Sequence, residues 1–359
     1  DECHNNSNIL NGFMGIEVSK RIITRFGKKL PTTYDSHGVY NTQEIKPWIQ
    51  DELMSCVQLY KKETKDELMD MNEDSPNFLK KAEELEFADK LECKLNRVLD
   101  RMCSGEWIVE QSDEGGLKLS PLTPRLFVNE VLTNHNDKNV FMSATILNPN
   151  FYIKEMNLDP NYTKVISAPS PFPLENRPIT FFPSGTIEYN DVDRSLDKMV
   201  PNVKMLLDHY PNDRGIIFTS SYTQANALIR KLNSSRLITH TDSASKKGMM
   251  DVHSKSSNTV IVSPSMHEGV DLKGDLSRFQ IVLKLPYLSL GSNQVRLRMK
   301  MDREWYIYCM CLTLIQSCGR SVRSDTDFAD TFILDNNFDR VLKYHSKFLP
   351  NYWLEALTC

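Results

Sequence analysis

The stretch Gly215-Ile216-Ile217-Phe218-Thr219-Ser220-Ser221 is a short apolar run that ends in three small hydroxyl side chains. Similar short, mostly apolar runs follow at 259–262, 280–283 and 331–334. Runs of this length are typical of strands that are buried on both faces. Helical patterns alternate with these runs near 195–209, 222–233, 244–254 and 303–318. The alternation predicts an α/β fold, a parallel sheet with helices on both faces.

Polar residues follow these strands, at the edge of a parallel sheet where ligands collect. Thr219 and Ser220 carry small hydroxyls beside backbone N–H groups, which suits phosphate contacts and equally suits an ordinary helix cap. After the 259–262 run comes Glu268-Gly269-Val270-Asp271. Its glycine permits close backbone approach, and Asp271 could couple a ribose or an arginine to the loop. Taken alone, this segment is slightly more typical of a loop with a structural carboxylate.

Gln316-Ser317-Cys318-Gly319-Arg320-Ser321-Val322-Arg323 carries a stronger signal. On a helix, Gln316, Arg320 and Arg323 stand at i, i+4 and i+7 and would project from one face. Two guanidinium groups on one stripe suit a polyphosphate, because arginine donates two hydrogen bonds at once and stays charged. The alternative is an exposed basic helix face. The apolar residues before Gln316 favour a mostly buried helix, in which arginines need anionic partners.

The N-terminal string Asp1-Glu2-Cys3-His4 has the form Asp-Glu-x-His. In P-loop ATPases an acid of this kind holds Mg²⁺, and the neighbouring glutamate can polarise the attacking water. Four residues alone are as typical of an exposed acidic turn. A helix is predicted after them from the spacing of Ile9, Phe13, Ile16, Ile22 and Phe26. Further on, Val140-Phe141-Met142 predicts a short buried strand that ends in Ser143-Ala144-Thr145.

Residues 44–103 form a richly charged segment, with fifteen acidic and ten basic side chains and therefore a net charge of −5. Apolar residues recur in it at helical spacing, in two blocks. Between the blocks, Ser75 can cap a new helix and Pro76 can occupy its first position. The segment predicts a projecting helical hairpin, and its acidic face is typical of a solvated helix surface.

Composition limits the classes of protein. The 359 residues predict two or three domains, and 40% hydrophobic with 25% charged residues is ordinary for a globular chain. Forty-three basic against forty-seven acidic side chains exclude a polycation, so nucleic acid would have to bind in a local groove. Eight cysteines without a Cys-x-x-Cys pair indicate an intracellular protein, in cytoplasm or nucleus. No apolar run approaches the ~20 residues of a membrane helix, so no membrane partner is expected.

The order and spacing of these motifs resemble the second half of a superfamily-2 DNA helicase of the XPD/DinG type. The matching strings are 1–4 for motif II in its DExH form, 143–145 for motif III, 215–221 for motif IV, 268–271 for motif V and 316–323 for motif VI. The family inserts a helical arch domain between motifs II and III, where this chain has roughly 140 residues. At His267, beside motif V, the family often has a tryptophan.

The resemblance implies RecA-like parallel-sheet motor domains, the first only partial, and an arch. Residues 1–30 and 105–178 would be the C-terminal part of the first motor domain, 31–104 the arch and 179–359 the second motor domain. It also implies an ATP-dependent DNA helicase or translocase, moving 5′ to 3′ in DNA repair or replication. ATP and Mg²⁺ are the implied cofactors, and single-stranded or forked DNA is the implied partner; protein partners are not indicated.

In the first motor domain, Asp1 would hold Mg²⁺, with Glu2 beside the metal activating water. His4 would couple the nucleotide state to DNA. Ser143 and Thr145 would link hydrolysis to motion.

In the second motor domain, Arg320 and Arg323 would be arginine fingers that reach the γ-phosphate, with Gln316 beside them. Gly269 and Asp271 would face the nucleotide and the domain interface. Thr219 and Ser220 would grip single-stranded DNA by its phosphates.

Two features of the chain bear on activity. It contains no Gly-Lys-Thr/Ser loop and begins inside a motif, so we expect a fragment whose P-loop lies upstream, together with any iron–sulfur cluster. The alternative is a non-catalytic DNA-binding or scaffold protein of helicase ancestry. Intact Glu2, Arg320 and Arg323 argue against it, because fold stability alone does not demand them.

Overall fold

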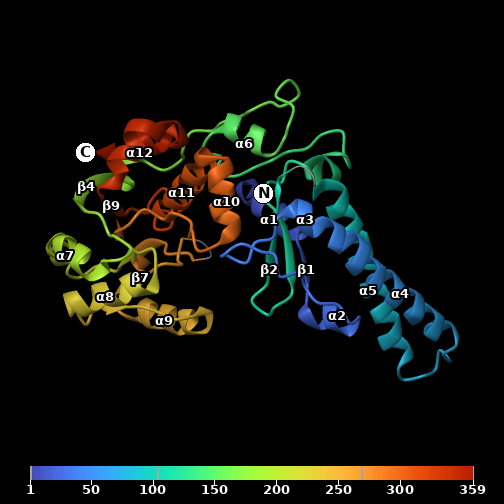
Figure 1. Cartoon of the computed structure of the whole chain (residues 1–359). Helices are drawn as coiled ribbons and strands as arrows, with labels where there is room; N and C mark the ends of the chain where they lie inside the picture. The colour runs from blue at the N-terminus through green and yellow to red at the C-terminus, as the bar shows by residue number, and fades with distance from the viewer. Residues whose placement is uncertain (1, 103–104, 268–269, 359) are drawn as a thin grey trace. The chain divides into compact units, whose positions relative to one another are not determined.

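The computed structural model describes residues 2–102, 105–267 and 270–358. The chain divides into two compact units (Figure 1). Unit 1 comprises Asp1–Ala144, Asn150–Thr163 and Leu290–Met301, and unit 2 comprises Thr145–Pro149, Lys164–Ser289 and Asp302–Cys359. Within the described ranges, the helices are too short or too polar to cross a membrane.

Unit 2 is built on a parallel sheet, in which the described residues supply seven strands in the order β10-β4-β9-β8-β5-β7-β6. The strands are β4 (Ile179–Gly185), β5 (Gly215–Phe218), β6 (Leu237–Ile238), β7 (Val260–Ser263), β8 (Phe279–Val282), β9 (Asp330–Asp335) and β10 (Leu357–Thr358). Neighbouring strands pair in parallel throughout. The four apolar runs that predicted strands are β5, β7, β8 and β9, each within one residue of its expected bounds. The α/β fold class is confirmed.

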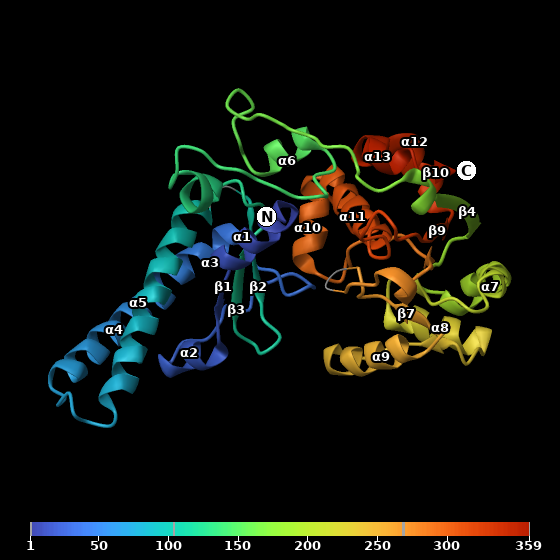
Figure 2. The same ribbon diagram turned by 180° about the vertical axis from the view of Figure 1, so that it is seen from behind.

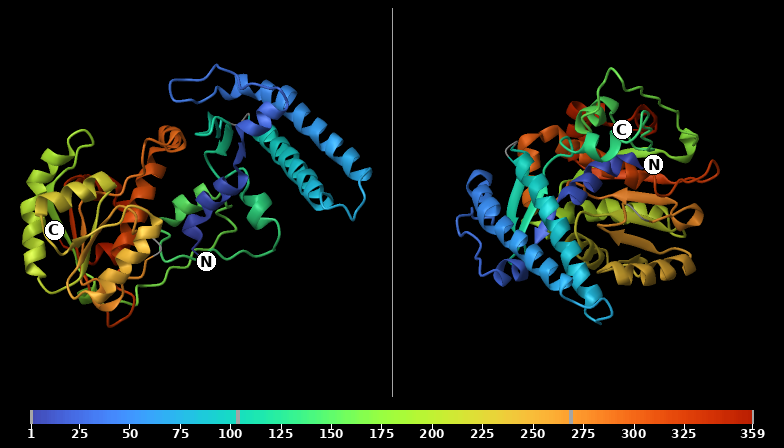
Figure 3. Two further views of the ribbon diagram at one scale, coloured as in Figure 1. Left: turned by 90° about the horizontal axis from the view of Figure 1, so that it is seen from below. Right: turned by 90° about the vertical axis from the view of Figure 1, so that its right-hand side faces the viewer.

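Helices lie on both sides of this sheet (Figure 3). They are α7 (Val192–His209), α8 (Tyr222–Leu232), α9 (Ser243–Lys255), α11 (Arg303–Cys318), α12 (Asn337–His345) and α13 (Asn351–Leu354), with 3-10 turns η5 (Leu174–Asn176), η6 (Gly274–Leu276) and η7 (Ser346–Phe348). The apolar faces of α7 and α8 pack on the sheet: Val203 and Leu228 share one core cluster with Ile217 and Val262. All four side chains are fully buried, which anchors the strand ends that carry the polar motifs.

Unit 1 contains a small antiparallel sheet with β3 (Leu117–Pro121) between β1 (Ile16–Val18) and β2 (Trp107–Gln111) (Figure 2). Its smaller helices are the 3-10 turn η1 (Cys3–Asn5), α1 (Asn6–Met14), α2 (Lys20–Arg25), the π-helical turn η4 (Asn129–Thr133) and α6 (Pro149–Glu155). The single helix predicted across residues 9–26 is wrong, because β1 interrupts it. Ile16 and Val18 pair with β3 and are buried while Glu17 is exposed, so strand pairing overrides the helical spacing.

The strand predicted at Val140-Phe141-Met142 is also wrong. These residues are in no strand or ladder, and Val140 and Met142 are 80% and 55% exposed. A backbone hydrogen bond from Cys3 N–H to the Met142 carbonyl (2.9 Å) holds the run in place.

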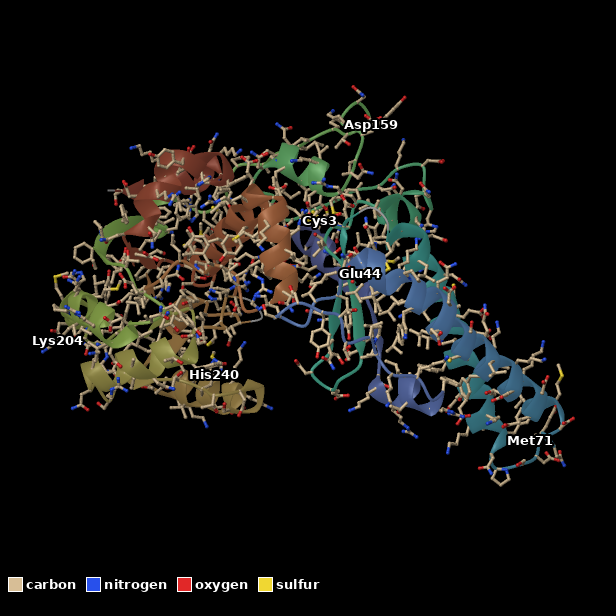
Figure 4. All side chains as sticks on the ribbon, viewed as in Figure 1. Cys3, Glu44, Met71, Asp159, Lys204 and His240 are labelled. Carbon is tan, nitrogen blue, oxygen red and sulfur yellow. The ribbon has the colours of Figure 1, made fainter. Side chains whose placement is uncertain are left out.

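The charged segment forms the expected helical hairpin. It contains α3 (Thr42–Pro47), the π-helical turn η2 (Trp48–Leu53), α4 (Met54–Met69) and α5 (Phe78–Arg101), and Figure 4 labels Met71 in the turn at its tip. Ser75 does not cap α5: its carbonyl accepts from Phe78 N–H (2.9 Å) in a turn, and the helix begins two residues later than predicted. The predicted arch bounds, 31–104, stay a prediction, as do those of both motor domains.

Helix α10 (Asn293–Met301) packs in unit 1, although the sequence placed it in the second motor domain. Its Arg298 is 2% exposed and donates to Glu155 Oε2 (2.5 Å). The Glu155 carboxylate also accepts from Ser7 Oγ (3.0 Å) and lies 4.0 Å from the Arg125 guanidinium. Burial raises the pKa of Glu155, and Arg298 opposes that shift. A buried ion pair therefore joins α6 and α10, and the Ser7 hydroxyl links α1 to it.

Replacing Arg298 with alanine is expected to destabilise unit 1 by about 3–5 kcal/mol, because it removes the hydrogen-bonded cation of the buried Glu155 carboxylate. Urea unfolding would measure this through Trp48 and Trp107, in a background in which Trp305 and Trp353 are phenylalanine. The matched control is Glu86→Ala, which breaks an exposed pair with Lys90 and should change stability by less than about 1 kcal/mol. Equal effects of the two variants would contradict the assignment.

Candidate active site

In unit 1 the structure brings motif II together with Ser143 of motif III, which lies 139 residues after His4. His4 Nδ1 lies 2.6 Å from Ser143 Oγ and 3.2 Å from Glu2 Oε2. Ser143 Oγ lies 3.5 Å from the same Glu2 oxygen. The His4 side chain is 4% exposed and that of Glu2 is 66% exposed. The buried imidazole thus links the serine hydroxyl to a carboxylate that faces solvent.

Backbone contacts of Cys3 set this arrangement. Cys3, labelled in Figure 4, is buried, which raises the pKa of its thiol. Besides the bond to Met142, its carbonyl accepts from the Tyr152 hydroxyl of α6 (3.2 Å). Glu2 adopts φ 49° and ψ 40°, a left-handed conformation that costs a non-glycine residue roughly 1–2 kcal/mol. Strain of this kind persists where the surrounding structure fixes the conformation.

The predicted magnesium ligands are Asp1 and Glu2. Asp1 lies outside the described residues, and the Glu2 carboxylate contacts His4 and Ser143. No group of three metal-ligating side chains occurs in the part of the chain that the structure describes. The metal assignment of Asp1 and Glu2 stays a prediction.

In unit 2 the hydroxyls after β5 hold a turn together. Thr219 is 1% exposed and donates from Oγ1 to the Ser221 carbonyl (3.2 Å). Ser220 is exposed, and its N–H and Oγ both donate to Gln224 Oε1 (3.1 and 3.0 Å). Ser221 caps α8 by accepting from Gln224 N–H (3.2 Å). Of the two predicted DNA-gripping residues, Ser220 is therefore the accessible one. Gln224 was missed, although Ser-x-x-Gln spacing is a helix-start signal.

Motif VI does not lie on one helix. Helix α11 ends at Cys318, where Gly319 N–H donates to the Ile315 carbonyl (3.1 Å). Gln316 is inside the helix and 8% exposed, whereas Arg320 and Arg323 follow its end. The prediction that all three side chains share a helix face is wrong.

A buried polar network ends the helix there. Ser321 Oγ donates to Ser277 Oγ (2.7 Å), and Gln280 Nε2 donates to the Cys318 carbonyl (2.6 Å) and to Thr331 Oγ1 (2.9 Å). All four side chains are at most 3% exposed. A buried polar network in which partners are satisfied fixes one geometry, because breaking it leaves desolvated groups behind. These residues were not predicted, since nothing local marks them as partners.

The Arg320 side chain is hydrogen-bonded to the loop of motif V. Its Nε donates to the His267 carbonyl (2.6 Å) and its Nη1 to the Val270 carbonyl (3.4 Å). The His267 ring stacks on Phe218, with centroids 5.2 Å apart, and its Nδ1 lies 2.6 Å from Ser317 Oγ. Burial lowers the pKa of His267 to about 4, and the positive charge of Arg320 acts in the same direction. His267 is therefore neutral at pH 7.

Arg323 presents the more accessible guanidinium. Its Nε lies 3.6 Å from Asp271 Oδ1, and the two side chains are 44% and 53% exposed. Gly269, the other predicted nucleotide contact in this loop, lies outside the described residues, as does Glu268. Thr145 is half-buried and belongs to unit 2, whereas Ser143 belongs to unit 1, so motif III is divided between the units.

Part of the chain that carries these residues is similar to a known protein family. Residues 204–355, which carry Asp271, Arg320 and Arg323, match the family described as Helicase C-terminal domain. This region is similar to helicase C-terminal domains. The ATP-dependent DNA helicase chl-1 of Caenorhabditis elegans is 23% identical in an alignment of 177 positions that covers 43% of this chain and 21% of that protein.

Two solved structures share the fold of almost the whole chain. The structure titled XPD_Helicase has a TM-score of 0.54 at 14% identity and covers 97% of this chain, which spans 66% of that one. The structure of S. tokodaii Xpd4 has a TM-score of 0.53 at 14% identity. The match covers 100% of this chain and 75% of the Xpd4 chain. The expected resemblance to XPD/DinG-type superfamily-2 helicases is confirmed, and the shared fold fits RecA-like domains.

Proposed function

We propose that the full-length protein is an ATP-dependent DNA helicase or translocase that couples ATP hydrolysis to 5′-to-3′ movement on single-stranded DNA. The observation that carries the proposal is the geometry of the helicase C-terminal domain. There Arg320 is bound to the carbonyls of the motif V loop, while the Arg323 guanidinium stands exposed beside Asp271. An arginine finger must exchange its protein partner for a phosphate of the nucleotide. An exposed, loosely paired arginine such as Arg323 can make that exchange, while Arg320 stays bound beside it.

In this proposal Glu2 accepts a proton from the attacking water, and Arg323 stabilises charge that develops on the transferred phosphoryl group. A magnesium ion held by Asp1 and Glu2 would neutralise phosphate charge. His4 senses the nucleotide through Glu2 and passes the change to Ser143, which it contacts at 2.6 Å. Gln316, Gly269 and Thr145 keep the roles that the family resemblance implies.

Single-stranded or forked DNA is the proposed nucleic-acid partner. Ser220 can offer its hydroxyl and N–H to a phosphate when Gln224 Oε1, which now accepts both, turns away. Contacts of this kind do not read sequence, and accompanying cationic contacts weaken with salt. An intracellular place of action, in cytoplasm or nucleus, and a role in DNA repair or replication follow from the proposed activity.

The 359-residue chain alone is expected to show no DNA-stimulated ATP hydrolysis, because the phosphate-cradling Gly-Lys-Thr/Ser loop is absent from it. The full-length protein is expected to hydrolyse ATP and to respond to single-stranded DNA. Phosphate release by both proteins, with and without a 40-nucleotide strand, measures this. Activity of the short chain would contradict the fragment proposal. A full-length protein that binds DNA without hydrolysing ATP would favour the scaffold alternative.

A further inference from the structure

One carboxylate joins the two loops that carry the proposed nucleotide contacts. Asp327 Oδ2 accepts from the backbone N–H of Arg323 (3.1 Å), and Asp327 Oδ1 accepts from the backbone N–H of Gly274 (3.1 Å). Gly274 closes the segment that contains Asp271, and Arg323 ends motif VI. Asp327 N–H in turn donates to the Ser324 carbonyl (3.3 Å), which closes the turn after Arg323. We propose that Asp327 is a positioning residue that holds Arg323 in place for ATP hydrolysis.

Arg323 needs such support more than Arg320 does. The Arg320 guanidinium is held by two carbonyls, and the following Ser321 is anchored in the buried network. The Arg323 side chain has an ion pair at 3.6 Å between half-exposed groups, a contact that fixes little. Its direction therefore depends on its backbone, which Asp327 fixes through a charge-assisted hydrogen bond, roughly twice as strong as a neutral one.

The two hydrogen bonds that Asp327 accepts affect the position of Arg323 and leave the charge near the phosphate unchanged. Because Asp327 binds backbone groups of both loops, losing it lets the Arg323 turn shift against the segment that ends at Gly274. Gly274 has φ +60°, so this segment has a defined left-handed bend that the carboxylate stabilises. A misplacement of about 1 Å can cost roughly 10²-fold in rate. The expected loss is therefore in kcat, with the KM for ATP little changed.

This inference rests on the proposed ATPase function and is tested in the full-length protein. Asp327→Ala removes both acceptors and should lower kcat by about 10–100-fold. Asp327→Asn keeps the shape and one acceptor oxygen, and should fall between wild type and Asp327→Ala. The matched control is Asp325→Asn, which removes an exposed negative charge from the same turn and should retain wild-type kcat.

The double variant separates positioning from a general structural effect. If Asp327 acts through Arg323, then Asp327→Ala should change kcat less than about twofold in an Arg323→Ala background. An equal loss in both backgrounds would overturn the inference, as would wild-type kcat for Asp327→Ala while Arg323→Ala is inactive. A wild type without ATPase activity would overturn the proposed function and this inference with it.

Discussion

Arg323→Ala is expected to lower ATP turnover of the full-length protein by about 10³–10⁵-fold, the contribution of arginine fingers in other phosphoryl-transfer enzymes. The guanidinium stands exposed and weakly paired with Asp271, so its removal should disturb the fold little. Ground-state ATP binding should remain largely intact, because the loss falls on the transition state. Steady-state hydrolysis beside equilibrium nucleotide binding measures both quantities.

Arg230→Ala is the matched control for this variant, since Arg230 is also exposed and also paired with one carboxylate, that of Asp193. It should hydrolyse ATP at the wild-type rate. Unchanged turnover in Arg323→Ala would refute the finger assignment. An equal fall in both variants would instead indicate a loss of folded protein.

Glu2→Gln is expected to reduce turnover by about 10²–10⁴-fold, the usual contribution of a general base. Glutamine keeps the shape of the side chain and can still meet His4 and Ser143, which lie 3.2 and 3.5 Å from the Glu2 carboxylate. It cannot accept the proton of the attacking water. ATP and single-stranded DNA should bind as in wild type, so hydrolysis and both affinities are measured together.

A control at another exposed glutamate of unit 1 makes the result specific. Glu17→Gln changes the same functional group on the exposed face of β1 and should leave hydrolysis unchanged. Full activity in Glu2→Gln would show that another group activates the water. Loss of ATP affinity in Glu2→Gln would point to a binding role in place of a base.

The strands that the sequence predicted correctly share one property: they are apolar runs in the centre of a parallel sheet. Strand β4 was missed because Pro183 lies within it and its pairing with β9 is irregular between Phe181 and Gly185, and proline argues against a central strand. β1 was missed because three residues carry too little periodicity to outweigh a helical pattern. The local sequence pattern is sufficient to predict a strand that is buried along its whole length. It fails where pairing with a distant strand determines the secondary structure.

The candidate site divides in the same way. His4, Ser143, Arg320 and Arg323 could be selected from motifs, and the structure brings His4 and Ser143 into contact. The end of α11 before Arg320 could not be predicted from the local sequence. It depends on Ser277 and on Gln280, which lie about forty residues earlier in the chain. The Asp327 bridge likewise joins groups up to 53 residues apart. The types of residue in the motifs indicate the chemistry of the site, whereas hydrogen bonds between residues far apart in the sequence determine its geometry.

The position of α10 has a consequence for biosynthesis. The chain leaves one unit for the other after residues 144, 149, 163, 289 and 301. Glu155 therefore gains its closest cationic partner, Arg298, only after 143 further residues have been made. At about 5–20 residues per second, a ribosome needs on the order of ten seconds to supply that arginine. During this interval the N-terminal unit is incomplete while most of the other unit emerges, so its folding finishes out of the order of synthesis.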